Sequence, residues 1–282
     1  MHPRATPLTR VDDHWIVHPR GRLSARSWTP AGDVLAAPLA LLHDSLGSVE
    51  LWRDFPAALA AATGRRVVAY DRLGFGRSDE REGAMPLDFI AEEAKDFFPS
   101  VLEQLGIDRF VVFGHSVGGG MAVHCAAELG ARCEALITES AQAFVEDRTV
   151  QGLLAAREQF KEAGQMERLA RYHGDKAAWV LEAWLGTWLS PQFAAWSLDA
   201  VLPRVACPAL ALHGEADEYG SALHPQRLRA GIGENASVQL LPGVGHVPHR
   251  EQAPRVLAAV AAWLQSSVST DGRPGSARRS RA

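Results

Sequence analysis

The stretch VVFGHSVGGG at residues 111–120 decides the fold that we expect for this chain. Its first half is an apolar run typical of a buried strand, and residues 121–127 that follow are compatible with a helix. Glycines stand two residues before and two residues after Ser116, which lets the strand and the helix approach closely at that serine. The pattern predicts a sharp strand-to-helix turn that exposes the Ser116 hydroxyl at the end of a sheet. A glycine-rich turn with an incidental serine is the alternative interpretation.

The segments on both sides of this turn alternate between apolar runs and helical patterning. Continuous apolar runs are typical of strands buried on both faces, and their alternation with helices predicts a mostly parallel sheet covered on both sides. The predicted fold class is therefore α/β, a doubly wound sheet preceded by an antiparallel hairpin. Besides the strand into Ser116, we expect strands at 14–18, 23–28, 39–42, 67–70, 135–138, 209–213 and 238–241, and helices at 51–62, 86–105 and 253–264.

Residues 141–203 interrupt the alternation, because they show helical patterning without a buried strand. We interpret them as a helical cap inserted between two strands of a core that consists of residues 14–140 and 204–265. The cap holds half of the 8 tryptophans of the chain. Trp184 and Trp188 are candidates for lining an apolar substrate pocket under the cap. Packing within the small core of the cap itself is the alternative role for these rings.

Composition and charge exclude several function classes. The formal net charge of −4 over 282 residues gives no reason to expect nucleic acid as a partner. The three cysteines form no C-x-x-C pair, so we expect neither a zinc site nor a disulfide framework. We also expect no cofactor. No apolar run approaches the roughly 20 residues of a membrane span, and charges interrupt the N-terminus, so a cytoplasmic protein is expected. Residues 1–13 are expected to be a loose lead-in, and residues 266–282 a disordered tail.

A serine hydroxyl is a weak nucleophile at neutral pH and needs a base, which in turn needs an acid to orient it. In doubly wound hydrolases the chain order is serine, acid, histidine. His246 follows a Gly-x-Gly loop after the last predicted strand, and we assign it as the base. Asp217 follows the strand before that one, and we assign it as the acid. Glu139, at the end of a neighbouring strand, remains the main alternative for the acid.

The remaining histidines near these motifs have simpler interpretations. His115 precedes the nucleophile and points away from the active side of such a turn, so we expect a structural role. His249 is expected to pack against the closing helix. Together with His246 it makes no metal site, because a third carboxylate or thiolate ligand in register is missing.

Backbone N–H groups are needed to stabilise the oxyanion that forms when the serine attacks. The residue after the nucleophile, Val117, supplies the first, aided by the positive end of its helix. The second is expected from the loop after residues 39–42, where we choose the Ser45 N–H and keep Leu46 as the alternative. The glycines in the loop 71–79 lack the Lys-[Ser/Thr] of a phosphate-binding loop, so we expect a structural turn.

Taken together, these motifs resemble the α/β-hydrolase superfamily, which includes esterases, lactonases, C–C bond hydrolases, haloperoxidases and the menaquinone-pathway lyase. The family commonly has His-Gly-x in the oxyanion loop, whereas Asp44 replaces that glycine here. A serine nucleophile also argues against a haloalkane dehalogenase, which uses aspartate. The resemblance rests on the loop 43–47, the turn 71–78, Gly114–Gly118, Gly214-x-x-Asp217 and Gly245–His246.

The resemblance implies a serine hydrolase that cleaves a small or medium carboxylic ester, thioester or lactone through an acyl-serine intermediate. A C–C bond hydrolase or lyase that uses the same three residues mainly as a base is the first alternative. A non-catalytic ligand-binding homologue is the second. The expected partner is a small molecule with an apolar part, without nucleic acid or membrane, and self-association into a homodimer stays open.

Overall fold

The computed structural model describes residues 9–32, 34 and 36–268. Its centre is an eight-stranded sheet with the strand order β1-β2-β4-β3-β5-β6-β7-β8. β1 and β2 form an antiparallel hairpin, β2 pairs antiparallel with β4, and all later pairs are parallel. The mostly parallel α/β sheet predicted from the sequence is therefore confirmed. The strands are β1 (Arg10–Ile16), β2 (Leu23–Thr29), β3 (Leu39–Leu42), β4 (Val67–Tyr70), β5 (Phe110–His115), β6 (Cys133–Glu139), β7 (Ala209–Gly214) and β8 (Ala236–Leu241).

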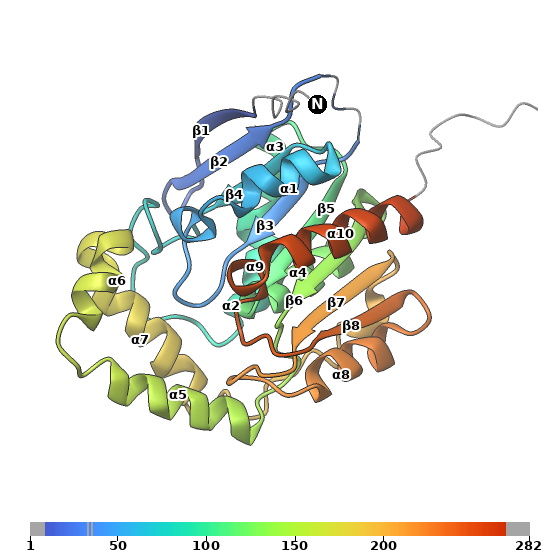
Figure 1. Cartoon of the computed structure of the whole chain (residues 1–282). Coiled ribbons are helices and arrows are strands. Elements are labelled where there is room, and N and C mark those ends of the chain that lie inside the picture. Colours follow the sequence, from blue (N-terminus) through green and yellow to red (C-terminus); the bar gives the residue numbers. More distant parts are fainter. Residues whose placement is uncertain (1–8, 33, 35, 269–282) are drawn as a thin grey trace, which may run out of the picture.

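Helices cover both faces of this sheet (Figure 1). Along β4, Val67 and Ala69 belong to one apolar cluster and Val68 and Tyr70 to the other, as the period of two in a strand requires. The first cluster is closed by α1 (Phe55–Thr63) and α10 (Ala253–Ser267). The opposite cluster is closed by α2 (Phe89–Glu92), α3 (Phe98–Gln104), α4 (Val117–Leu129) and α8 (Leu223–Ile232).

The segment between β6 and β7 forms a helical insertion, which we call the insertion from here on. Its main helices are α5 (Asp147–Gln159), α6 (Gln165–His173) and α7 (Ala177–Trp188). They lie together beyond one end of the sheet (Figure 1). An isolated antiparallel bridge between Phe144 and Ser197 joins the two ends of the insertion.

Several boundaries differ from those predicted, and each difference has a local cause. The strand predicted at 14–18 is β1, which begins at Arg10, so the lead-in is ordered from there on, while residues 1–8 lie outside the described residues. The sequence did not predict residues 10–13 as part of the strand, because their side chains are mostly polar. β1 is an edge strand with one face in water, where polar residues are common. The helix predicted from 51 begins at Phe55, after a 3₁₀ turn over Val49–Trp52.

The helix predicted at 86–105 is interrupted by a π-helical turn over Glu93–Phe97. Pro99, in the first turn of α3, has no N–H to donate to the carbonyl group of Lys95. The missing hydrogen bond is therefore a local reason for the wider turn.

The C-terminal helix was predicted too short. α10 continues to Ser267, so residues 266 and 267 are helical and not part of a tail. The rest of the predicted tail, from 269 onward, lies outside the described residues.

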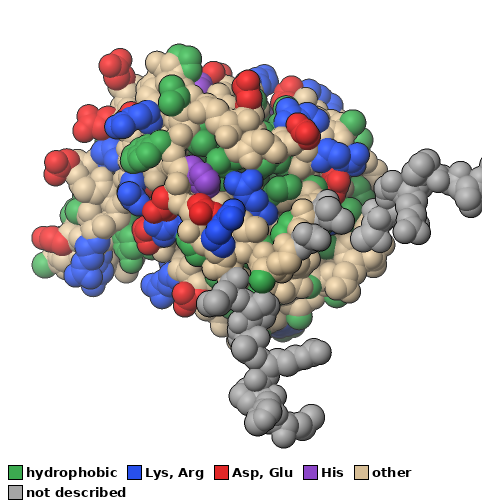
Figure 2. All heavy atoms as spheres, turned by 90° about the horizontal axis from the view of Figure 1, so that it is seen from above, with side chains coloured by type: hydrophobic (Ala, Val, Ile, Leu, Met, Phe, Trp, Pro, Cys, Tyr) green, Lys and Arg blue, Asp and Glu red, His purple; other side chains and the backbone are tan. Residues whose placement is uncertain are grey.

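The surface beside β1 and β2 carries both signs of charge. Figure 2 shows acidic and basic side chains interspersed over this face. Arg26 lies 2.6 Å from Asp13, and Arg22 lies 3.0 Å from Asp79. Such exposed pairs contribute little stability, so the fold depends on the two apolar clusters rather than on them.

Candidate active site

Ser116 lies in a strained turn between β5 and α4. Its backbone has φ 55° and ψ −123°, which is unusual for a residue with a side chain. A Cβ atom on Gly118 would lie 2.2 Å from the Leu42 carbonyl oxygen, and one on Gly114 would lie 2.0 Å from the Gly118 carbonyl oxygen. Both positions therefore require glycine, as the sequence pattern predicted, and the close packing around them holds the serine in its strained conformation.

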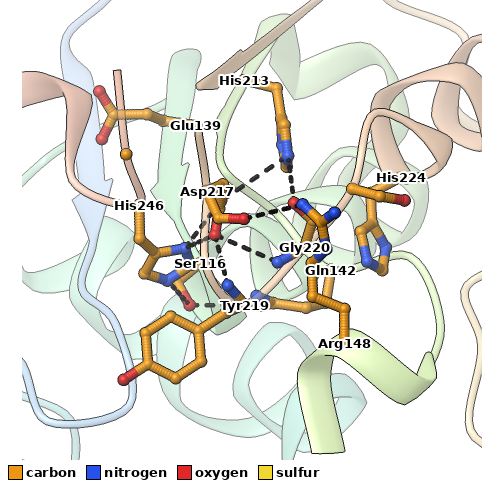
Figure 3. Close-up of polar contacts among 12 residues, drawn as sticks. Ser116, Glu139, Gln142, Arg148, His213, Asp217, Tyr219, Gly220, His224 and His246 are labelled. Carbon is orange, nitrogen blue, oxygen red and sulfur yellow. Dashed lines mark hydrogen bonds and ion pairs between the residues drawn. The ribbon is translucent and has the colours of Figure 1, made fainter. Parts of the chain in front are cut away.

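The structure brings together three side chains that are far apart in the sequence (Figure 3). The His246 Nε2 atom lies 3.0 Å from the Ser116 Oγ atom. On the other side of the ring, His246 Nδ1 lies 2.9 and 2.8 Å from the two carboxylate oxygens of Asp217. Ser116 follows β5, Asp217 follows β7 and His246 follows β8, so the carboxyl ends of three parallel strands supply them. With Nδ1 protonated, Nε2 is free to accept the serine proton.

The Asp217 carboxylate is fixed by its own loop. One of its oxygens accepts the N–H groups of Tyr219 at 2.8 Å and of Gly220 at 3.1 Å. Burial alone would raise the pKa of Asp217, but the hydrogen bond and charge of His246, the charge of His213 and the Tyr219 N–H lower it overall. The carboxylate therefore stays ionised at neutral pH and is oriented to stabilise a charged His246.

Glu139, the alternative acid, makes different contacts. Its Oε2 atom lies 2.5 Å from His249 Nδ1 and 3.2 Å from His115 Nδ1. Burial would raise the pKa of Glu139, but the charge of His249 and the hydrogen bonds from both histidines bring it to about 2. Burial would lower the pKa of His115, but its hydrogen bonds to Glu139 and the charges of Glu139 and Asp44 together raise it. Glu139 is thus the centre of a buried cluster, and Asp217 is the carboxylate that contacts His246.

The ligand atoms of His115, Glu139 and His249 lie within 4.8 Å of one another, close enough to hold a metal ion. Hydrogen bonds already join these groups to each other, and all three side chains are almost completely buried. The cluster therefore has the contacts of a structural ion pair, and it includes His249, which also packs against Trp52 and Phe55.

We predict that Glu139→Gln lowers the free energy of unfolding by about 3 kcal/mol at pH 7, because it removes the counter-charge of the buried His115, whose pKa is raised. The pKa of Glu139 is about 2 when folded and 4.5 ordinarily, so its contribution is complete above pH 4.5 and is lost as the pH falls towards 2. Urea unfolding at pH 7 and at pH 3 measures the difference. The exposed Glu162→Gln variant is the control, and an equal loss in both variants would contradict the prediction.

A cavity of about 230 Å³ opens beside Ser116 and His246. Ser45, Trp184 and Trp188, three residues singled out from the sequence, line it. Leu46, the alternative oxyanion donor, lines it as well. The site is thus a pocket between the sheet end and α7 of the insertion.

The loop that carries Ser45 is held by its neighbours. His43 Nδ1 lies 2.8 Å from the Asp44 carbonyl oxygen, and the Arg72 guanidinium donates to the same oxygen at 2.8 Å. His43 Nε2 accepts the Arg72 N–H at 3.1 Å, and burial holds the pKa of His43 well below its usual value. Among the described residues, the N–H groups of Ser45 and Val117 donate to no protein acceptor. Both are therefore available to a ligand.

Sequence reasoning missed Gln142, although it contacts the nucleophile. The Gln142 side-chain oxygen lies 3.3 Å from Ser116 Oγ, and the residue is 4% exposed. It lies just beyond the carboxyl end of β6, the strand next to β5. Its position just after a predicted strand next to the nucleophile strand could have identified Gln142 as a candidate site residue.

Tyr219 and Glu218 were also missed as pocket residues. Both follow Asp217 directly and line the cavity, and the Tyr219 ring lies 4.8 Å from the His246 ring. Asp44, noted only as a departure from a motif, lines the cavity too.

Comparison with known proteins now identifies the family. A family model described as the alpha/beta hydrolase fold matches residues 37–184, more than half of the chain. This chain belongs to the α/β-hydrolase family. The human protein named serine hydrolase BPHL is 28% identical to this α/β-hydrolase over 215 residues, covering 74% of the chain and 72% of the relative. A proline iminopeptidase of Lactobacillus delbrueckii subsp. lactis is 34% identical over 87 residues, covering 31% of the chain and 30% of the relative.

Solved structures agree with this α/β-hydrolase fold. Proline iminopeptidase from Mycobacterium smegmatis superposes with a TM-score of 0.70 at 24% identity, covering 91% of this chain and 98% of that one. The enol-lactonase from Burkholderia xenovorans LB400 gives a TM-score of 0.68 at 20% identity, with coverages of 89% and 100%. Among the described residues, the helices are too short or too polar to cross a membrane.

Proposed function

We propose that this α/β-hydrolase is a serine hydrolase that cleaves a small or medium carboxylic ester, thioester or lactone. The observation that carries the proposal is the chain of contacts from Ser116 through His246 to Asp217, with distances of 3.0 and 2.8 Å. Proton transfer along such a chain is what makes a serine hydroxyl nucleophilic. The name of the human relative, a serine hydrolase, supports the same chemistry.

In this proposal Ser116 Oγ attacks the ester carbonyl carbon while His246 accepts the hydroxyl proton. The resulting oxyanion is stabilised by the N–H groups of Val117 and Ser45, which have no protein acceptor among the described residues. When the bond to the leaving group breaks, His246 returns the proton to the departing alcohol. Water, deprotonated by His246, then attacks the acyl-serine, and His246 returns that proton to Ser116 Oγ as the bond to the acyl group breaks and the acid is released.

The substrate pocket is completed by the helical cap that we propose for residues 141–203. Trp184 and Trp188 from α7 supply apolar surface to the cavity, and we propose them as contacts for the apolar part of the substrate. The cytoplasmic location and the homodimer stay predictions from the sequence.

A panel of substrates tests the reaction type. It consists of p-nitrophenyl esters of increasing acyl length, lactones and vinylogous 1,5-diketones, each run beside the Ser116→Ala variant. We expect ester or lactone turnover and, in rapidly quenched samples, a peptide containing Ser116 whose mass has increased by the acyl group. Turnover of diketones alone would instead identify a C–C hydrolase. Ligand binding without turnover of any substrate would identify the non-catalytic homologue.

A further inference from the structure

The cavity beside Ser116 is lined by two acidic side chains and by no lysine or arginine. Asp44 comes from the loop after β3, and Glu218 comes from the loop after β7. Asp44 approaches only His115 among the ion pairs of the described residues, at 3.7 Å, and Glu218 takes part in none of them. The Asp44 Oδ1 atom is buried without a hydrogen-bond partner among these residues. Glu218 therefore has no ion-pair partner among the described residues, and the cationic groups that act on Asp44, His115 and Arg72, lie outside the cavity lining.

Tyr219 lines the same cavity as the two carboxylates and is affected by their charges. The pKa of Tyr219 is raised to about 12, first by burial and then by the charges of Glu218, Asp217 and Asp44. The phenol therefore stays neutral and is able to donate a hydrogen bond to a carboxylate or accept one from a ligand.

Aromatic rings also line the cavity. Trp184, Trp188 and Tyr219 border the cavity, and the Trp184 and Tyr219 ring centroids lie 6.0 Å apart. A cation is attracted to the face of such rings as well as to carboxylates. Two carboxylates beside aromatic rings, in a cavity lined by no lysine or arginine, therefore favour a positively charged ligand over a neutral or a negative one.

We propose that the pocket selects substrates carrying a protonated amine, with Asp44 and Glu218 as the anionic groups that attract the ammonium and the rings of Trp184 and Tyr219 beside it. This inference rests on the proposed serine hydrolase function and names its substrate class, an ester, thioester or lactone with an ammonium group. The same charges act on the reaction product. Hydrolysis releases a carboxylate next to Ser116, and repulsion by Asp44 and Glu218 favours its departure.

Three p-nitrophenyl esters of equal acyl length, ending in an ammonium, a methyl or a carboxylate group, test the selectivity. We expect kcat/KM for the ammonium ester to exceed that for the methyl ester by about tenfold at low salt, and the carboxylate ester to be the poorest substrate. Because salt screens charges, this ratio should fall when the ionic strength is raised. An ammonium-to-methyl ratio of one or below would overturn the proposal.

The variants Asp44→Asn and Glu218→Gln keep the side-chain shape and remove the charge. Each is expected to lower the ammonium-to-methyl ratio about threefold, and the double variant is expected to abolish the preference. The ratio is internal to each enzyme, so a general loss of activity does not affect it. Glu215→Gln, an exposed position on the same loop outside the cavity lining, is the matched control and should keep the wild-type ratio. A preference that survives the double variant would contradict the assignment of these two residues.

A binding measurement keeps this inference separate from the proposed reaction. In the Ser116→Ala variant, quenching of tryptophan fluorescence is followed with 4-phenylbutylamine, 4-phenylbutanol and 4-phenylbutyrate. Tightest binding of the amine supports the cation preference even when no ester is turned over, in which case only the proposed reaction fails. Equal or tighter binding of the alcohol or the carboxylate would overturn the preference, whatever the catalytic result.

Discussion

Replacement of Ser116 by alanine is expected to lower kcat/KM for any ester substrate by about 10⁴- to 10⁶-fold. The variant loses Ser116 Oγ. Among the described residues, this atom is the only hydrogen-bond partner of His246 Nε2. The pocket and the free N–H groups of Ser45 and Val117 remain, so a small residual rate above that of water is expected. Steady-state kinetics with a p-nitrophenyl ester measures the loss.

The matched control is Ser237→Ala, which removes an exposed serine from β8 and should leave kcat/KM within twofold of the wild-type value. Thermal unfolding of both variants shows whether they are folded. Retention of more than a tenth of the wild-type rate by folded Ser116→Ala would refute the role of Ser116 as nucleophile.

Asp217→Asn is expected to lower kcat by about 10⁴-fold without unfolding the protein. An amide in place of the carboxylate can donate a hydrogen bond to His246 Nδ1. The ring proton would then be on Nε2, and Nε2 would have no lone pair with which to accept the Ser116 proton. The substitution also removes the negative charge that stabilises a protonated His246. The Tyr219 and Gly220 N–H groups still have the amide oxygen as an acceptor, so the loop is expected to keep its conformation.

Comparison of Asp217→Asn with Glu139→Gln decides between the two candidate acids. Asp217 contacts His246, whereas Glu139 contacts His115 and His249, so the first variant should lose activity and the second mainly stability. Measurements of kcat from pH 5 to 9 and of urea unfolding on both variants separate these effects. A larger loss of kcat in a folded Glu139→Gln would transfer the acid role to Glu139.

The parts of this fold that could be predicted from sequence are those in which local pattern and burial agree. The central strands are fully buried and mostly apolar, so the sequence predicted their ends to within one or two residues. α8 was not assigned, because Pro225, Gly231 and several polar side chains obscure its helical pattern. The break before α3 was also missed, since it depends on how Pro99 is accommodated among buried neighbours.

For the candidate site, the sequence was informative about the residues that have a fixed place in the chain order. Ser116, Asp217 and His246 were each singled out by a strand end and flanking glycines, and the structure brings them together. The charge of the pocket was not predictable in the same way. It results from Asp44 and Glu218, which come from loops whose approach is set only by tertiary packing.

The bridge between Phe144 and Ser197, supported by the hydrogen bond from the Leu198 N–H to the Ala143 carbonyl oxygen at 2.8 Å, has a consequence for how this enzyme family can diversify. The two segments that join the insertion to the sheet therefore lie side by side at this bridge. Residues between the two ends are thus free to be lengthened, shortened or exchanged during evolution without a change in strand order. New specificities can arise where the insertion lines the pocket, while Ser116, Asp217 and His246, which follow β5, β7 and β8, keep their places.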